Sequence, residues 1–147
     1  MSEIALFPGS FNPFTVGHLS VVERAAPLFE KLIIAIGINN KKVSSVDVEG
    51  RLAAIKMAVS HLPNVSVIFY SGLTVDACRE YGAKFMLRGV RSVTDFEYER
   101  NLADINRKIA GIETILLYTL PEHASISSSV VRELDSYGYD ISSFLPE

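Results

Sequence analysis

The sequence lacks features that secreted and membrane-spanning proteins need. Cys78 is its single cysteine, so an internal disulfide is impossible, and a lone thiol fits a reducing cytoplasm. No run of apolar residues approaches the roughly 20 that span a bilayer, and the first residues lack the basic segment of a signal peptide. We therefore expect a cytoplasmic protein without a membrane span, with Cys78 in its core.

The chain also lacks a strong charge and several catalytic patterns. Its net charge of -3 gives no overall attraction to nucleic acid or to an anionic membrane, so a phosphate site must gather its cations locally. The patterns GxxxxGK[ST] and GxGxxG are absent, which argues against a P-loop kinase and a common dinucleotide site. HExxH, paired cysteines and GxSxG are absent too, and their absence argues against a zinc site and a serine hydrolase.

What is present is an alternation of apolar runs and helical patterns. The 147 residues are 48% hydrophobic, enough for one domain covering residues 1–147. Buried strands are expected at 4–7, 32–36, 65–70, 85–87 and 114–118. Amphipathic helices that pack on the sheet are expected between them, one of them with the apolar stripe Tyr98, Leu102, Ile105 and Ile109. This order predicts an α/β fold with a doubly wound, five-stranded parallel sheet.

Ligands of such a sheet bind beyond the carboxyl ends of the strands. The loop after the first strand places Gly9 and Ser10 at that edge, where they suit an anion, because glycine leaves room for a phosphate. Gly17 and His18 lie near a helix start, whose N–H groups and dipole attract phosphate. His18 could then donate a hydrogen bond to a reacting phosphate. In the alternative interpretation, the glycines only shape a tight loop and His18 is a surface residue.

A basic segment follows the fourth strand. Arg88 and Arg91 flank Gly89, and two guanidinium groups so spaced can hold two phosphates. Arg88 directly follows an apolar strand, where an unpaired charge is costly, so a ligand partner is expected for it. Glu99 could pair with Arg91, accept a ligand hydrogen bond, or lie in solvent.

Two further segments complete the predicted site. A helix is expected to begin among Ser127, Ser128 and Ser129, whose hydroxyls are helix caps and also donors for terminal phosphates. Arg132, one turn later, is a secondary candidate. Lys41 and Lys42 follow the second strand, and a flexible ammonium, Lys42 above all, could steer a phosphate from there.

Three motifs together resemble one family. Residues 9–18, the segment Arg88-Gly89-Val90-Arg91 with 95–99, and 126–129 closely resemble the bacterial phosphopantetheine adenylyltransferases, of the Rossmann-like nucleotidylyltransferase superfamily, over nearly the whole chain. The resemblance implies transfer of the adenylyl group of ATP to 4'-phosphopantetheine, giving pyrophosphate and dephospho-coenzyme A in coenzyme A synthesis. It also implies Mg²⁺ accompanying ATP, no metal ligands from the protein, coenzyme A as a possible feedback ligand, and a homohexamer.

The resemblance assigns roles to individual residues. Catalysis would rest on His18, Lys42 and Arg91, with in-line attack on the α-phosphorus and no covalent intermediate. The acceptor would contact Ser10, Lys42, Thr74 and Arg88. ATP would contact Ser10, Phe11, His18, Gly89, Val90, Arg91, Glu99, His123, Ala124, Ser125, Ile126, Ser127, Ser128 and Ser129.

Two other functions keep most of these features. Another transferase of the superfamily, using CTP or accepting nicotinamide mononucleotide, would share the His18 loop but differ in its acceptor pocket. A nucleotide-binding regulatory module without turnover would bind phosphate through the same motifs. Product analysis separates the first from our prediction, and pyrophosphate release separates the second.

Overall fold

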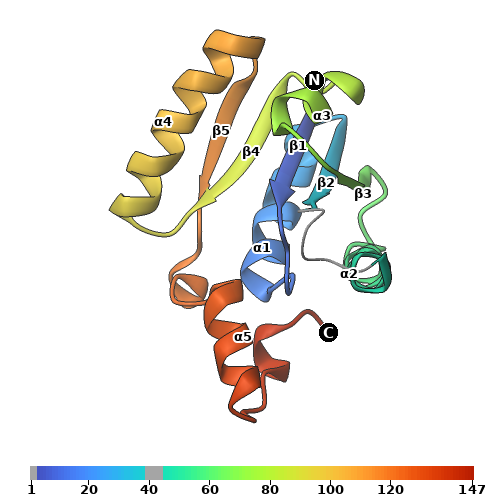
Figure 1. The fold of residues 1–147 in the computed structure, drawn as a ribbon, viewed down its shortest axis with the longest axis vertical. Coiled ribbons are helices and arrows are strands. Elements are labelled where there is room, and N and C mark those ends of the chain that lie inside the picture. The colour runs from blue at the N-terminus through green and yellow to red at the C-terminus, as the bar shows by residue number, and fades with distance from the viewer. Residues whose placement is uncertain (1–2, 39–44) are drawn as a thin grey trace.

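The computed structural model describes residues 3–38 and 45–147, in which strands and helices alternate (Figure 1). The strands are β1 (Ile4–Gly9), β2 (Lys31–Gly37), β3 (Val65–Tyr70), β4 (Phe85–Val90) and β5 (Glu113–Tyr118). The α-helices are α1 (Val16–Ala25), α2 (Ser45–Ala58), α3 (Thr74–Glu80), α4 (Val93–Ala110) and α5 (Ser128–Ser136). Short 3₁₀ helices lie at Ala26–Leu28, Pro121–His123 and Ser142–Phe144.

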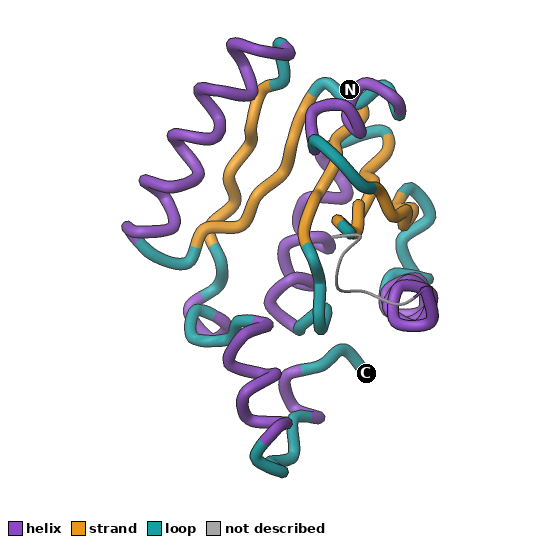
Figure 2. The backbone as a smooth tube through the Cα atoms, viewed as in Figure 1, coloured by secondary structure: helices purple, strands orange, loops and turns teal. Residues whose placement is uncertain are grey.

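The five strands form one parallel sheet with the order β3-β2-β1-β4-β5. This confirms the predicted doubly wound α/β fold. The chain builds outward from β1 to β3, then crosses to the other side of β1 to add β4 and β5. The direction of winding therefore reverses between β1 and β4, which is where open α/β sheets bind ligands. In Figure 2 the strands lie side by side between helices, and α5 lies beyond their carboxyl ends.

Both faces of the central strands are buried, which explains their continuous apolar sequences. On one face Phe7, Ile34 and Leu87 pack with residues of α1 and α2, such as Val22 and Ile55. A second set covers the other face and comprises Leu6, Ile33, Ala35, Met86 and Ile112 with Val75, Ala77 and Cys78 of α3. Each fully buried large aliphatic side chain contributes about 1.5–3 kcal/mol, so this double layer holds the strand ends firmly.

The two strands at the reversal point separate toward their carboxyl ends. Between β1 and β4 the sheet pairs only Ala5 with Phe85 and Leu6 with Met86, whereas β1 and β2 pair along six positions. Beyond these pairs the Arg88 side chain bridges the strands, because its Nη1 donates to the Pro8 carbonyl at 2.6 Å. The loss of pairing thus opens a crevice between the carboxyl ends of β1 and β4.

Two expectations about the basic segment and its neighbours need correction. β4 continues to Val90, so Arg88 and Gly89 belong to the strand and not to a loop after it. The reason is pairing with β5, which reaches Val90 opposite Tyr118. The sequence patterns also missed α3, whose seven residues are too few to show a clear helical period.

The predicted packing of α4 was wrong. Its apolar stripe was expected to lie on the sheet, but Tyr98, Ile105 and Ile109 are 61%, 53% and 56% exposed. Among the residues of α4, all of which the structure describes, only Glu99 is buried. The helix lies beside the edge strand β5 (Figure 1) and turns a carboxylate toward β4, leaving the stripe uncovered.

Two remaining predictions concern Cys78 and the membrane. Cys78 is fully buried, as predicted, and burial raises the pKa of its thiol to about 11. Over residues 3–38 and 45–147, no helix has the length and apolar character to cross a bilayer.

Candidate active site

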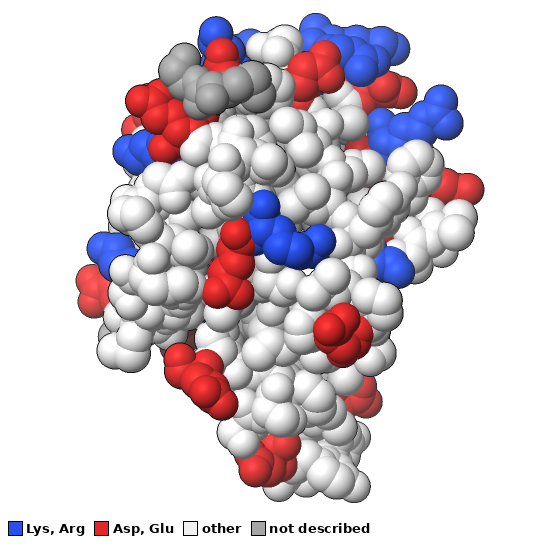
Figure 3. Space-filling model, turned by 180° about the vertical axis from the view of Figure 1, so that it is seen from behind, with Lys and Arg blue, Asp and Glu red and all other residues white. Residues whose placement is uncertain are grey.

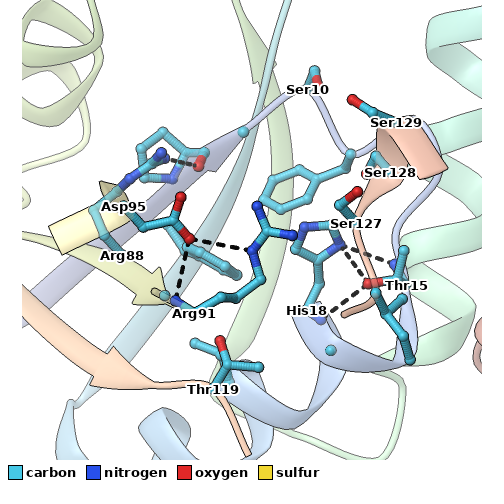
Figure 4. Close-up of a pocket in the computed structure, with 18 of the residues that line it drawn as sticks. Ser10, Thr15, His18, Arg88, Arg91, Asp95, Thr119, Ser127, Ser128 and Ser129 are labelled. Atoms are coloured by element: carbon cyan, nitrogen blue, oxygen red, sulfur yellow. Dashed lines mark hydrogen bonds and ion pairs between the residues drawn. The ribbon is translucent and has the colours of Figure 1, made fainter. Parts of the chain in front are cut away.

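The crevice between β1 and β4 opens into a cavity of about 390 Å³. Segments distant in the sequence line it, namely the end of β1 with the following loop and the start of α1, the end of β4, the start of α4, Thr119 after β5, and the start of α5 with the residues before it. Figure 4 shows His18, Arg91 and the three serines facing the same space. Convergence of these segments at one edge of the sheet was the central prediction from the sequence.

The loop after β1 is shaped by aromatic packing. Phe11 has a φ of 47°, in the left-handed region that phenylalanine rarely adopts, and its ring packs at 5.2 Å from the ring of Phe7. Gly9 accommodates that ring, because a Cβ atom at Gly9 would lie 2.8 Å from Cζ of Phe11. The space beside Gly9 that was expected to accommodate a phosphate is therefore filled by the ring of Phe11.

His18 lies in the first turn of α1 and is held by Thr15, the N-cap residue. The Thr15 amide donates to His18 Nδ1 at 2.9 Å, and the Thr15 hydroxyl lies 3.1 Å from the same nitrogen. In return, the His18 amide donates to the Thr15 hydroxyl at 3.3 Å. This is a capping box in which histidine occupies the position usually held by glutamate or glutamine.

The His18 ring is enclosed by aromatic rings. The ring of Phe14 stacks on it at 5.5 Å, and that of Phe11 meets it edge-on at 5.1 Å. The pKa of His18 is lowered to about 4, chiefly by burial and then by the positive charges of Arg91 and Arg88. At neutral pH the imidazole is therefore uncharged and fixed in orientation.

Arg88 is held by Glu99 of α4. Nε and Nη2 of Arg88 donate to the two carboxylate oxygens at 2.9–3.0 Å, and the Glu99 side chain is only 8% exposed. The suggested pairing of Glu99 with Arg91 was therefore wrong. Burial of Arg88 without a ligand is explained by this ion pair together with the Pro8 carbonyl, since a buried guanidinium needs a partner.

Arg91 pairs with Asp95 in the first turn of α4. Its Nε and its backbone amide both donate to Asp95 Oδ2, at 3.3 and 3.2 Å. The Arg91 side chain remains 38% exposed and faces the cavity (Figure 4). Arg91 is thus restrained but keeps donors for an anionic ligand.

The three serines at the start of α5 have different hydrogen-bond partners and do not form a uniform array of donors. Ser127 caps the helix by accepting from the Val130 amide, whereas Ser128 donates its hydroxyl hydrogen to the Pro13 carbonyl at 2.7 Å. Ser129 accepts from Arg132, whose Nη1 also donates to the Asn12 carbonyl at 2.6 Å. Ser127 and Ser129 can therefore donate to a ligand, while Ser128 and Arg132 tie α5 to the loop after β1.

A second cavity of about 440 Å³ lies on the other side of the Arg88–Glu99 pair. It shares Pro8, Gly9, Ser10, Arg88 and Glu99 with the first cavity. The rest of its lining is mostly apolar and includes Leu73, Met86, Leu102, Ile105 and Ile109, with the polar side chains of Tyr70, Thr74 and Asn106. A ligand with a long, weakly polar arm suits this cavity.

Most of the predicted site residues come together. The first cavity is lined by Ser10, Phe11, His18, Arg88, Gly89, Arg91, Glu99, Ile126, Ser127, Ser128 and Ser129, and the second by Ser10, Thr74, Arg88 and Glu99. The structure does not place Val90, His123, Ala124 and Ser125 in either lining. Val90 is buried, and His123 packs near Gly17 at the start of α1. Lys42 lies outside the described residues.

Thr15, Asp95 and Asn106 are functional candidates that the sequence patterns did not single out. A signal for Thr15 existed, because Thr15 and His18 have capping-box spacing, but the usual pattern requires glutamate or glutamine at the second position. Asp95 and Asn106 gave no signal of their own, since charged and amide residues are common on helix surfaces.

Metal-binding residues are not gathered in the described part of the chain. No group of three or more histidine, cysteine, aspartate or glutamate side chains there could hold an ion. Donors surround the first cavity instead, namely guanidinium groups, hydroxyls and an imidazole. The free donors of this lining suit an anionic ligand.

The fold and this lining define a nucleotidyltransferase. Residues 6–134 match the cytidylyltransferase-like family, to which the chain belongs. The fold is also similar to that of a bifunctional NMN adenylyltransferase/ADP ribose pyrophosphatase from Francisella tularensis, whose crystal structure is complexed with AMP and a Mn ion. The match covers the whole of this chain and 45% of the Francisella chain. Its TM-score is 0.72 at 18% identity, so the likeness concerns the fold.

Within this class the chain belongs to the phosphopantetheine adenylyltransferase family. It is 53% identical over 144 residues to the enzyme of that name from Porphyromonas gingivalis, covering 98% of this chain and 94% of the relative. The Bacteroides thetaiotaomicron phosphopantetheine adenylyltransferase is 51% identical over 143 residues, covering 97% and 95%. The family expected from the sequence motifs is confirmed.

Proposed function

We propose that the chain transfers the adenylyl group of ATP to 4'-phosphopantetheine, releasing pyrophosphate and forming dephospho-coenzyme A. The observation that carries this proposal is the pair of adjoining cavities. The first has the donors that a triphosphate needs, and the second has the apolar length that a pantetheine arm needs. They meet at Ser10 and Arg88, where the acceptor phosphate would lie next to the α-phosphorus.

The residues suggest catalysis by positioning and charge stabilisation. Arg88 and Ser10 would hold the acceptor phosphate, and Thr74 would contact the pantetheine arm. Arg91, Ser127 and Ser129 would bind ATP, and His18 would donate a hydrogen bond to the phosphoryl group as negative charge develops. We retain Lys42 as a further contact on the basis of the family resemblance. No covalent nucleophile is needed for in-line attack.

Mg²⁺ would enter as a complex with ATP. It would neutralise part of the triphosphate charge, as in other phosphoryl and nucleotidyl transfers.

The uncovered α4 stripe supports self-association. Contiguous exposed apolar residues are unusual on a monomer and mark interaction sites, and homo-oligomers are the commonest soluble assemblies. Seen from behind, the molecule has many charged side chains at the top of the view, and further charged side chains are scattered over its middle and lower part (Figure 3). We propose the homohexamer implied by the family resemblance, located in the cytoplasm.

Coenzyme A is a plausible competitor for both cavities. It contains the pantetheine arm of the acceptor and an adenylyl group like that of ATP. We propose that it binds across the shared Arg88–Glu99 wall and competes with both substrates.

The test is an assay of the purified protein with ATP, phosphopantetheine and Mg²⁺ that measures pyrophosphate and dephospho-coenzyme A. We expect both products in equal amounts, with CTP and nicotinamide mononucleotide unable to replace ATP and phosphopantetheine. Absence of pyrophosphate would favour a binding module. Equal turnover with nicotinamide mononucleotide would favour another transferase of the superfamily.

A further inference from the structure

Thr15 contacts His18 in a way that determines where the imidazole carries its hydrogen. A backbone amide nitrogen can only donate, so the 2.9 Å contact from Thr15 N requires His18 Nδ1 to be an acceptor. A neutral imidazole with an unprotonated Nδ1 carries its hydrogen on Nε2. In a doubly protonated ring Nδ1 would also carry a hydrogen, and this N–H would face the N–H of the Thr15 amide, so that two donors would oppose each other.

The other ring nitrogen faces the reaction space. In Figure 4 the dashed lines run from one ring nitrogen to Thr15, and the opposite nitrogen faces Arg91. Nε2–H and the Arg91 guanidinium therefore face the same cavity. A phosphate oxygen bound between them would accept hydrogen bonds from both donors.

We propose that Thr15 is a positioning residue of the transfer reaction: its amide and hydroxyl hold His18 in the tautomer that presents Nε2–H to the transferred phosphoryl group. This deepens the proposed function and rests on it. The hydroxyl lies within reach of both groups that must be fixed, Nδ1 at 3.1 Å and the His18 amide at 3.3 Å. By accepting from the amide, it directs its own hydrogen to Nδ1.

The surroundings of the ring support a neutral donor. Phe11 and Phe14 pack against it and provide no charge to stabilise an imidazolium. Arg91 and Arg88, the charged groups that act on it, both oppose protonation. A neutral imidazole donor kept in one tautomer is an established catalytic arrangement in other enzymes.

Two substitutions separate this role from helix capping. Serine and aspartate are both good N-caps, so Thr15→Ser and Thr15→Asp should leave α1 intact. Serine keeps a hydroxyl that can donate to Nδ1. Aspartate is only an acceptor when ionised, so beside Nδ1 it favours a hydrogen on that nitrogen and a charged ring.

The direct measurement is long-range ¹H–¹⁵N NMR of the imidazole rings in the full chain without ligands. Only three histidines are present, and the His18→Gln variant identifies the His18 signal. In the wild type and Thr15→Ser we expect hydrogen on Nε2 alone at pH 7. In Thr15→Asp we expect hydrogen on Nδ1 as well, and titration of the ring at a higher pH.

Kinetics of the same variants complete the test. At saturating substrates we expect kcat of Thr15→Ser within about threefold of wild type, and kcat of Thr15→Asp lower by on the order of tenfold or more, as for loss of one hydrogen bond in the transition state. Wild-type His18 with its hydrogen on Nδ1, or Thr15→Asp with wild-type tautomer and kcat, would overturn the proposal. The NMR result does not require turnover, so it separates failure of this inference from failure of the proposed reaction.

Discussion

His18 serves two purposes, since it completes the capping box of α1 and lines the first cavity. Substitution by alanine removes both contributions, whereas glutamine is the usual residue at this capping position and can accept from the Thr15 amide. We expect His18→Ala to lower kcat by on the order of a hundredfold or more, as for loss of a transition-state donor. His18→Gln should also lose turnover but retain more stability.

Steady-state kinetics and urea unfolding of the two variants check this expectation. If His18→Ala turned over at nearly the wild-type rate, His18 would not be the transition-state donor. If His18→Gln were no more stable than His18→Ala, the capping contribution of the imidazole would be negligible.

The buried imidazole should also make stability depend on pH. Its folded-state pKa of about 4 lies below the ordinary value of 6.5, so between these pH values the unfolded chain binds a proton that the folded chain does not. The contribution of the neutral imidazole to the free energy of unfolding is complete above about pH 6.5 and is lost as the pH falls toward 4. This contribution is about 3 kcal/mol for a pKa shift of this magnitude.

Urea unfolding of wild type and His18→Gln at pH 7.5 and pH 5 measures this effect. From pH 7.5 to pH 5, the free energy of unfolding should decrease more for the wild type than for His18→Gln. We expect the two decreases to differ by up to about 2 kcal/mol. Parallel curves for the two proteins would show that the imidazole titrates normally in the folded state.

Single residues show both the strength and the limit of sequence reasoning. His18 and Arg91 were proposed because an imidazole and a guanidinium beyond the carboxyl ends of strands suit a phosphate, and both side chains line the first cavity. The partner of Arg88 was not identifiable. Glu99 lies eleven positions away, and only the packing of α4 against β4 brings its carboxylate within 3.0 Å of the guanidinium.

β4 and α4 are joined by the partly buried Arg88–Glu99 pair, and both residues line both cavities. Arg88→Ala leaves the buried Glu99 carboxylate without its partner and should cost less than the roughly 3–5 kcal/mol of a fully buried pair, because the Arg88 side chain is 28% exposed. Arg88→Ala/Glu99→Ala removes both charges and should cost less than the sum of the single substitutions. A double-mutant cycle by chemical unfolding measures the coupling, and additive losses would contradict a direct interaction.

Helices and strands were predictable to different degrees. The cores of the strands were apparent because β1, β2 and β4 are buried on both faces and read as continuous apolar runs. Their ends were missed because Pro8, Gly9 and Arg88 are not typical strand residues, although they pair or bridge at the crevice. The helical period of α4 was recognised correctly, but a period does not tell whether the apolar stripe faces a sheet, a ligand or another subunit.

The sequence was sufficient to predict that the segments after the strands meet, because the carboxyl ends of parallel strands lie at one edge of the sheet. The second cavity could not be foreseen in the same way. It depends on the position of α4 beside β4 and β5, where Leu102 and Ile105 line a space together with residues of α3 and β1. More of the residues predicted for the site therefore line the first cavity than the second.

The exposed stripe of α4 gives the last prediction, that the chain associates with copies of itself. Ile105 is 53% exposed on this stripe, and Ile105→Glu would place a charge within an apolar interface, which is costly. We expect light scattering after size-exclusion chromatography to give a multiple of the 16.2 kDa chain mass for the wild type and a smaller mass for Ile105→Glu. Arg100→Glu, an exposed position on a different face of α4, should keep the wild-type mass. Because Ile105 also lines the second cavity, the deciding measurement is the mass and not the activity. A wild-type protein with the mass of a single chain would refute the assembly.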